Sequence, residues 1–266
     1  MAKVQTILAG LNFPESPVFD STGNLWFVEI KGGNLACWNG RELTRYNVDG
    51  TPNGMRFNST GQIVFTDSGR GAIRQFDPVN RSFKTLCTHT VDDKPLKRPN
   101  DLIFDIAGNL LFSDHADGRQ EPVSTICVLP VGSDRALVVS NKKFFTNGMA
   151  FRKDNKTLLF AETYRQQIWT AQWDTDCLFL SDERVFAKAG KGPQGPDGMV
   201  LDEDENLYVA VFNESKVDVF DKQGRIIRTL QCKGRQPTSC TFGPSGKPGL
   251  VVTEAEWGEI VSFQQP

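Results

Sequence analysis

Six polar residues recur at one position of a repeated phrase, and together they could bind a cation. Each follows a proline or, once, a threonine, and a short apolar run comes after it. In chain order they are Glu15, Asn53, Asn100, Asn147, Asp197 and Thr238. Carboxylate and amide oxygens suit Ca²⁺, Mg²⁺ or Mn²⁺, whereas the sequence has no His/Cys cluster of the kind that zinc favours. The set predicts a divalent-cation site wherever the fold brings its members together.

A simpler interpretation competes with this one. Asn-Gly and Asp-Gly pairs are common turn formers, so Asn53-Gly54, Asn147-Gly148 or Asp197-Gly198 alone could each be a plain turn. A turn explains the glycine after the polar residue. It does not require a carboxylate at Glu15, nor acids and amides at equivalent positions of every repeat.

The spacing of these residues indicates the elements that carry them. Successive members are separated by 38, 47, 47, 50 and 41 residues. A period of about 40–50 residues with several short strands is typical of β-propeller blades. Strand signals dominate the chain, and many strands are apolar throughout, as expected where both faces pack against neighbouring sheets.

Each repeat can be divided into four antiparallel strands. The last repeat supplies only an inner strand, a second and a third (239–242, 250–253 and 259–263), and the N-terminal segment 3–8 can supply its outer strand. Such a join closes the ring without an open edge. We therefore expect an all-β fold: one six-bladed β-propeller domain over residues 1–266, closed by the N-terminal strand.

This fold gathers the six polar residues at one mouth of the central channel, because each begins an inner strand. The second strand of each blade runs back to the same face. At or near its end stands an acid or an amide: Glu29, Asp67, Asp114, Glu162, Asn213 or Glu254. We expect this face to be rich in oxygen ligands.

Four phrases of the repeat have a distinctive composition and order: Pro14-Glu15-Ser16-Pro17-Val18-Phe19-Asp20, Arg98-Pro99-Asn100-Asp101, Thr146-Asn147-Gly148-Met149-Ala150-Phe151 and Gly195-Pro196-Asp197-Gly198-Met199. In these phrases the chain resembles the SMP-30/gluconolactonase/LRE-like family over nearly its whole length. The resemblance implies a six-bladed propeller that holds one divalent cation in its channel and hydrolyses lactones.

The resemblance also implies residue roles. Glu15, Asn147 and Asp197 would be the metal ligands, and Asp197 would also be the general base. Asn100 would contact substrate or metal, and Arg98 would contact substrate. The usual Glu-Gly-Pro is here Glu15-Ser16-Pro17, and the usual Pro-Asn-Gly is Thr146-Asn147-Gly148, but neither change removes a ligand.

Two further residues are expected to bind substrate. Asn53 could donate a hydrogen bond to a substrate hydroxyl. His115 follows Asp114 at the channel face and begins a loop, 115–122, that we expect at the mouth. A structural role for His115 remains open beside that of substrate contact or base.

These residues and the family resemblance together predict a metal-dependent lactonase acting on a small lactone-like molecule. Ca²⁺ is the first choice of cation, with Mg²⁺, Mn²⁺ or Zn²⁺ as alternatives. A cation at the mouth can polarise the lactone carbonyl while a carboxylate takes a proton from water. Two alternatives stay open: a non-catalytic NHL-like propeller with a structural ion, and a metal-dependent isomerase of a biosynthetic pathway.

Composition narrows the other possibilities. The net charge is −2 and basic residues are dispersed, which gives no footprint for nucleic acid or for an anionic membrane. No stretch is apolar enough to span a bilayer, and the N-terminus lacks the pattern of a secretory signal, so we expect a cytoplasmic location. Six scattered cysteines without a CxxC pair are expected to be free thiols. Oligomeric state is not readable from the sequence.

Overall fold

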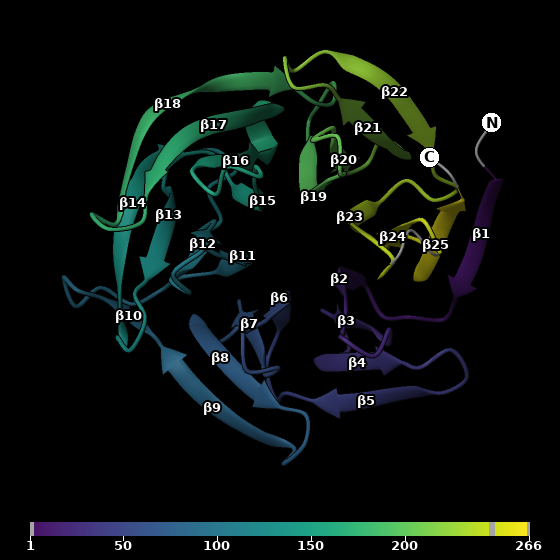
Figure 1. The fold of residues 1–266 in the computed structure, drawn as a ribbon, viewed down its shortest axis with the longest axis horizontal. Coiled ribbons are helices and arrows are strands. Elements are labelled where there is room, and N and C mark those ends of the chain that lie inside the picture. Colours follow the sequence, from purple (N-terminus) through teal and green to yellow (C-terminus); the bar gives the residue numbers. More distant parts are fainter. Residues whose placement is uncertain (1–2, 245–247, 265–266) are drawn as a thin grey trace.

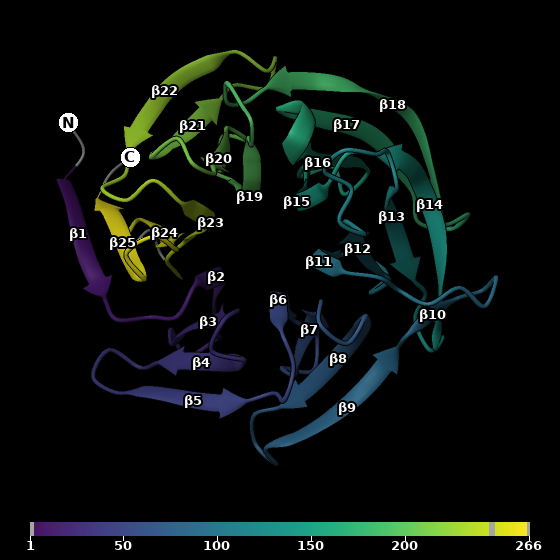
Figure 2. The same ribbon diagram turned by 180° about the vertical axis from the view of Figure 1, so that it is seen from behind.

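The repeated phrase folds six times into the same kind of small antiparallel sheet. The structure is a computed structural model that describes residues 3–244 and 248–264. In this part of the chain six sheets surround a central axis, one strand of each nearest the axis (Figure 1). The view from behind shows the same order from axis to rim (Figure 2). The predicted six-bladed β-propeller is confirmed.

Each blade has the strand order expected from the sequence. The innermost strands are β2 (Pro14–Phe19), β6 (Pro52–Phe57), β11 (Pro99–Phe104), β15 (Thr146–Phe151), β19 (Pro196–Leu201) and β23 (Pro237–Phe242). The second strands are β3 (Leu25–Glu29), β7 (Ile63–Asp67), β12 (Leu110–Asp114), β16 (Thr157–Glu162), β20 (Leu207–Val211) and β24 (Leu250–Glu254). The third strands are β4 (Asn34–Trp38), β8 (Ala72–Asp77), β13 (Ser124–Leu129), β17 (Gln167–Asp174), β21 (Lys216–Phe220) and β25 (Glu259–Gln264). The outermost strands are β5 (Leu43–Asn47), β9 (Ser82–Cys87), β14 (Arg135–Lys143), β18 (Phe179–Lys188), β22 (Ile226–Gln231) and β1 (Lys3–Leu8).

Strand β1 closes the ring as predicted. It pairs antiparallel with β25, with Val4 opposite Phe263, and so becomes the outer strand of the last blade. The two ends of the ring are thereby joined within one sheet, and neither the first nor the last blade is left with an open edge.

One blade departs from the expected four strands. A two-residue strand, β10 (His89–Thr90), pairs parallel with β14 and adds a fifth strand to the third blade. The connection from β9 to β11 is long, and its first residues run along the outer edge of β14, where the Val91 amide donates to the Ala136 carbonyl at 2.9 Å. A strand of two residues was too short to detect from the sequence.

Apolar packing between neighbouring blades holds the ring together. All five residues are buried in each of β3, β7, β12, β20 and β24. Among the described residues, six apolar clusters form the core, each made mainly by two adjacent blades. The second strands therefore pack on both faces, which explains their continuously apolar sequences.

The remaining structural expectations concern cysteines and membrane spans. All six cysteines belong to the described part of the chain and are free, as predicted. Residues 3–244 and 248–264 contain no helix with the length and hydropathy to cross a bilayer.

Candidate active site

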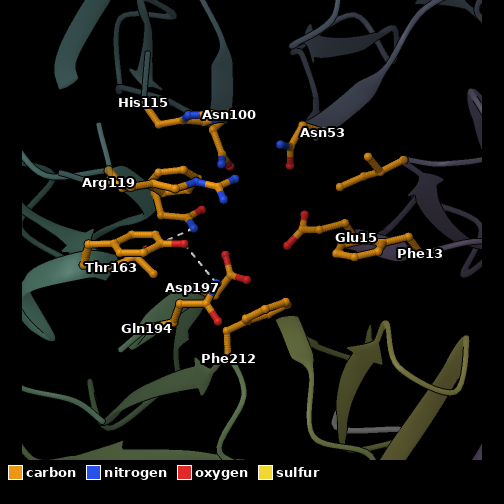
Figure 3. Close-up of a pocket in the computed structure, with 14 residues that line it drawn as sticks. Phe13, Glu15, Asn53, Asn100, His115, Arg119, Thr163, Gln194, Asp197 and Phe212 are labelled. Atoms are coloured by element: carbon orange, nitrogen blue, oxygen red, sulfur yellow. Dashed lines mark hydrogen bonds between the residues drawn. The ribbon is translucent and has the colours of Figure 1, made fainter. Parts of the chain in front are cut away.

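A pocket of about 210 Å³ opens at one mouth of the channel. Its walls are formed by Phe13, Glu15, Ile30, Asn53, Asn100, His115, Arg119, Phe145, Asn147, Thr163, Tyr164, Gln194, Asp197 and Phe212. Figure 3 shows the carboxylates of Glu15 and Asp197 and the amides of Asn53 and Asn100 pointing into one central space. Such a volume suits a small molecule, being below the roughly 300–1,000 Å³ of drug-sized sites.

Five of the six recurring polar residues line this pocket. The sixth, Thr238, is instead tied into the sheet: its hydroxyl donates to the Pro14 carbonyl at 2.8 Å and lies 2.7 Å from the Thr253 hydroxyl. In every inner strand the pairing register shifts next to the polar residue, as between Glu15 and Val18. Bulges of this kind re-aim side chains, and here they accompany side chains directed into the channel.

The glycines that follow three of these residues are explained by close packing rather than by turns. Gly54, Gly148 and Gly198 lie inside strands β6, β15 and β19. A Cβ atom on Gly148 would lie 2.2 Å from the Asp197 carbonyl oxygen, and one on Gly54 would lie 2.4 Å from that of Asn100. The inner strands converge so closely that no side chain fits there. The plain-turn interpretation is wrong.

Glu15 and Asp197 are a pair of carboxylates that disfavour each other's charge. Burial raises the pKa of Glu15 well above its ordinary value, and the charges of Asp197 and Asp101 raise it further. Burial and the charge of Asp101 likewise raise the pKa of Asp197. A cation between the two carboxylates would relieve this repulsion.

Asp101, which sequence analysis missed as part of the site, is a third carboxylate near the ring. It lies 3.7 Å from the Arg56 guanidinium and accepts a hydrogen bond from the Met149 amide at 3.0 Å. Arg56 also lowers the pKa of Glu15. The three carboxylates of Glu15, Asp101 and Asp197 and the single guanidinium of Arg56 together carry a formal net charge of −2. That net charge matches a divalent cation.

The amide of Asn147 is oriented by its neighbours. Its Nδ2 donates to the Thr163 hydroxyl at 3.2 Å, and that hydroxyl in turn donates to the Pro196 carbonyl at 2.7 Å. With the amide nitrogen engaged in this way, the Asn147 Oδ1 oxygen is the atom available to a cation. Thr163 is therefore a positioning residue for the candidate ligand set.

The side chains that could bind a hard cation are of two kinds, carboxylates and amides. No group of three or more His, Cys, Asp or Glu side chains within residues 3–244 and 248–264 is arranged to hold a metal ion. The pocket supplies two carboxylates and completes the set with amide oxygens of Asn147 and Asn100. Such all-oxygen sets are typical of Ca²⁺, and of Mg²⁺ with added water.

The acids at the ends of the second strands do not face the pocket, contrary to our expectation of an oxygen-rich face. Glu29, Asp67, Asp114, Glu162 and Glu254 are buried. Their carboxylates accept hydrogen bonds from backbone amides of the loops that enter the inner strands: Asn12, Thr51, Lys97, Phe144 and Gln236. They hold the mouth in shape, and they would not be ligands.

A second layer of pocket residues arises from two further positions of the repeat. One is two residues before the ring position, and the other directly follows the end of the second strand. In all six blades a backbone hydrogen bond joins them, for example from the Ile30 amide to the Phe13 carbonyl at 3.0 Å and from Thr163 to Phe145 at 3.1 Å. We call these positions the rim layer. Its pocket-lining members are Phe13, Ile30, His115, Phe145, Thr163 and Phe212.

Two predicted site residues, His115 and Arg98, occupy rim-layer positions, but only His115 lines the pocket. His115 lines the pocket, where burial and the charge of Arg98 lower its pKa to about 4. Its ring stacks on Phe145, with centroids 4.1 Å apart. Arg98 is exposed, and its side chain is not among the pocket walls. Arg119, from the expected mouth loop, lines the pocket instead.

Several pocket residues were therefore missed: Phe13, Ile30, Arg119, Phe145, Thr163, Tyr164, Gln194 and Phe212. Five of them follow the repeat at fixed offsets from residues already marked, so the offsets themselves were a usable signal. Arg119, Tyr164 and Gln194 lie outside the repeated positions, in connections that differ between blades. Arg119 belongs to the mouth loop 115–122 that was expected from the sequence, whereas no repeated position marks Tyr164 or Gln194.

Comparison with known proteins places the chain in a family. Residues 13–256 match the family model described as the SMP-30/Gluconolactonase/LRE-like region. The chain belongs to this family. Members that it resembles include regucalcin of Danio rerio, at 25% identity over 96% of this chain and 88% of that protein, and regucalcin of Oryctolagus cuniculus, at 28% over 92% and 83%.

Solved structures of similar fold carry names from the same family. The gluconolactonase XC5397 of Xanthomonas campestris superposes with a TM-score of 0.87 at 23% identity, over 100% of this chain and 90% of that one. A calcium-binding regucalcin of Agrobacterium tumefaciens gives 0.83 at 18% identity, over 99% and 93%. At these identities the likeness shows the shared propeller.

Proposed function

We propose that the protein is a divalent-metal-dependent hydrolase that opens the ring of a small lactone. The observation that carries the proposal is the pair of carboxylates, Glu15 and Asp197, whose pKa values are raised in a pocket that also holds amide oxygens. Family membership supports a lactonase-type activity, because similar proteins include a gluconolactonase.

Glu15, Asn147 and Asp197 would hold the cation, with Asn100 as a further oxygen donor. Ca²⁺ is the first candidate, supported by the name of a calcium-binding regucalcin of the same fold. The bound cation would act as a Lewis acid toward the lactone carbonyl.

The chain's own residues would carry the proton transfers. Asp197 takes a proton from water, whose oxygen bonds to the carbonyl carbon. The ring C–O bond then breaks, the proton passes to the departing alkoxide oxygen, and a hydroxy acid results. Asn53 and Asn100 donate hydrogen bonds that orient the substrate. The neutral imidazole of His115 stacks on the Phe145 ring and forms one side of the pocket with it. Arg119, rather than Arg98, would be the arginine that contacts the substrate, because Arg119 lines the pocket.

The proposal is tested by product analysis with γ-lactones. The wild-type protein, supplied with Ca²⁺, is incubated with unsubstituted and substituted γ-butyrolactones, and hydroxy acid is quantified above the uncatalysed rate. We expect hydroxy acid from the wild type and none above background from Asp197→Asn. An isomer of the lactone as product would show an isomerase. Binding without any product would show a non-catalytic propeller, and either result would reject the hydrolase.

A further inference from the structure

The mouth of the pocket is apolar, in contrast to the polar ring beneath it. Phe13, Phe145, Tyr164 and Phe212 contribute four aromatic rings, and Ile30 adds an aliphatic side chain. All five are half-buried, so part of their apolar surface remains open to the pocket. A ligand with a matching apolar surface would cover it.

The aromatic residues form two facing walls. Phe13 and Phe212 lie together, with ring centroids 6.4 Å apart. On the other side, the ring centroid of Phe145 lies 4.1 Å from that of His115 and 5.2 Å from that of Tyr164. Figure 3 shows Phe13 and Phe212 on one side of the central space and His115 and Arg119 across from them.

The propeller itself does not demand aromatic residues here. Equivalent rim-layer positions in other blades carry the polar residues Thr51, Ser68 and Gln236. Moreover, Phe13 and Phe145 have φ angles of 63° and 61°, a conformation that bulky side chains rarely adopt. Strained positions of this kind are often associated with function.

Two of the polar side chains at this level, Gln194 and Thr163, are already hydrogen-bonded within the protein. The Gln194 Nε2 atom donates to the Tyr164 hydroxyl at 3.0 Å, and its Oε1 accepts from Asn213. The Thr163 hydroxyl is engaged with Asn147 and Pro196. A hydroxyl of a sugar lactone that faces one of the aromatic rings would lose its water partners there, which costs binding free energy.

Arg119 lies against the second wall. Its guanidinium lies 5.6 Å from the centroid of Phe145 and 5.8 Å from that of Tyr164, and it pairs with Asp117 at 2.9 Å. The charge of Arg119 is thus partly balanced by Asp117, and the guanidinium lies over both aromatic rings.

We propose that the substrate is a lactone with an aryl or alkyl substituent, which lies between the Phe13–Phe212 pair and the His115–Phe145–Tyr164 cluster. The lactone ring then faces Glu15 and Asp197. This inference rests on the proposed lactonase function and names its substrate class: hydrophobic lactones rather than polyhydroxylated sugar lactones.

Three γ-lactones of equal ring size test the preference. These are γ-phenyl-γ-butyrolactone, unsubstituted γ-butyrolactone and D-galactono-1,4-lactone, assayed for kcat/KM with Ca²⁺-loaded protein. We expect the phenyl lactone to exceed both others by roughly tenfold or more, the scale of discrimination that apolar pockets provide. A higher kcat/KM for the hydroxylated lactone would overturn the inference while leaving the hydrolase proposal intact.

Variants locate the preference in the walls. Phe145→Ala and Phe212→Ala should each lower kcat/KM for the phenyl lactone about tenfold and change that for γ-butyrolactone by much less. Phe179→Ala, which removes a 59% exposed aromatic ring on β18, is the matched control and should change neither value. An equal loss on both lactones from the wall variants would contradict the assignment.

Binding of non-hydrolysable lactams separates this inference from the hydrolase proposal. We compare 5-phenylpyrrolidin-2-one with D-glucono-1,5-lactam by calorimetry. Tighter binding of the phenyl lactam supports the apolar mouth even if no lactone is hydrolysed, in which case only the hydrolase proposal fails. Tighter binding of the hydroxylated lactam, or binding of neither, overturns the inference.

Discussion

The charge of Asp197 on β19 raises the pKa of Glu15 on β2, although the two residues are far apart in the chain. The inner strands bring them to the same pocket, where burial adds to their repulsion. Two carboxylates kept together at a cost to folding are characteristic of sites that bind cations or transfer protons.

Neutralising either ring carboxylate should weaken cation binding and stabilise the metal-free protein. In Glu15→Gln and Asp197→Asn we expect Ca²⁺ affinity to fall by roughly 100-fold or more, because a charged ligand is lost. The melting temperature in chelator should rise by a few degrees, because a buried repulsion is removed. Calorimetric titration and thermal denaturation measure the two effects.

Glu29→Gln is the matched control for these variants. Glu29 is also buried, but it is paired with Arg45 at 2.5 Å and accepts from the Asn12 amide at 3.0 Å. Its replacement should lower the melting temperature and leave Ca²⁺ affinity nearly unchanged. A stabilising Glu29→Gln, or destabilising ring variants, would contradict the distinction between ligands and structural acids.

Stability and cation binding should depend on pH in opposite directions. The folded-state pKa values of Glu15 and Asp197 lie above their ordinary values of 4.5 and 3.8, so the folded protein binds protons more tightly than the unfolded chain. Metal-free stability should therefore fall as the pH rises above about 4. Ca²⁺ affinity should rise over the same range, with release of protons on binding.

Titrations in buffers of different ionisation enthalpy measure that proton release, and thermal denaturation in chelator measures the stability trend. Asp197→Asn should release fewer protons than the wild type. Binding without proton release between pH 5 and 7 would show that the carboxylates are already ionised without the cation.

Thr163 should control cation affinity through Asn147. Thr163→Val removes the hydroxyl that accepts from the Asn147 amide at 3.2 Å, so the amide is free to turn its nitrogen toward the site. We expect Ca²⁺ affinity to fall roughly 10- to 100-fold, as for other residues that orient metal ligands. Thr163→Ser, which keeps the hydroxyl, should retain affinity. Equal losses in both variants would indicate a packing defect instead.

Gly148→Ala should disrupt the site through the backbone. The added methyl group would lie 2.2 Å from the Asp197 carbonyl oxygen. To relieve this clash, the backbone of β15 or β19 would have to shift. We expect about 2–3 kcal/mol of destabilisation. Gly40→Ala, with φ of 92° and open space around it, should cost only about 1 kcal/mol. Chemical denaturation compares them, and equal costs would argue against close strand packing.

The sequence predicted the propeller because its evidence is periodic. Every blade repeats the position of Glu15 or its equivalent, and closure by β1 follows from the missing outer strand of the last repeat. The same recurrence brought Asn53, Asn100, Asn147 and Asp197 to one pocket. The recurring position can be recognised even where its residue type differs from one blade to the next.

What the sequence did not predict depends on contacts between blades. Asp101 follows Asn100 directly, yet only the structure shows its charge acting on Glu15. The acid Asp114 looks like a candidate ligand in the sequence, but its two oxygens accept from the Lys97 and Arg98 amides at 2.8 Å. Side-chain direction at strand ends depends on such bonds, which no pattern of residue types reveals.

In the proposed function, hydrolysis depends on a cation held by Glu15, Asn147 and Asp197. The protein is stripped with chelator, dialysed, and assayed for hydrolysis of γ-phenyl-γ-butyrolactone and γ-butyrolactone while Ca²⁺ is titrated back and its binding is measured in parallel. We expect activity to be lost on stripping and to return in proportion to one bound cation per chain, with no recovery in Asp197→Asn. Full activity in the stripped protein would contradict the proposed cation dependence.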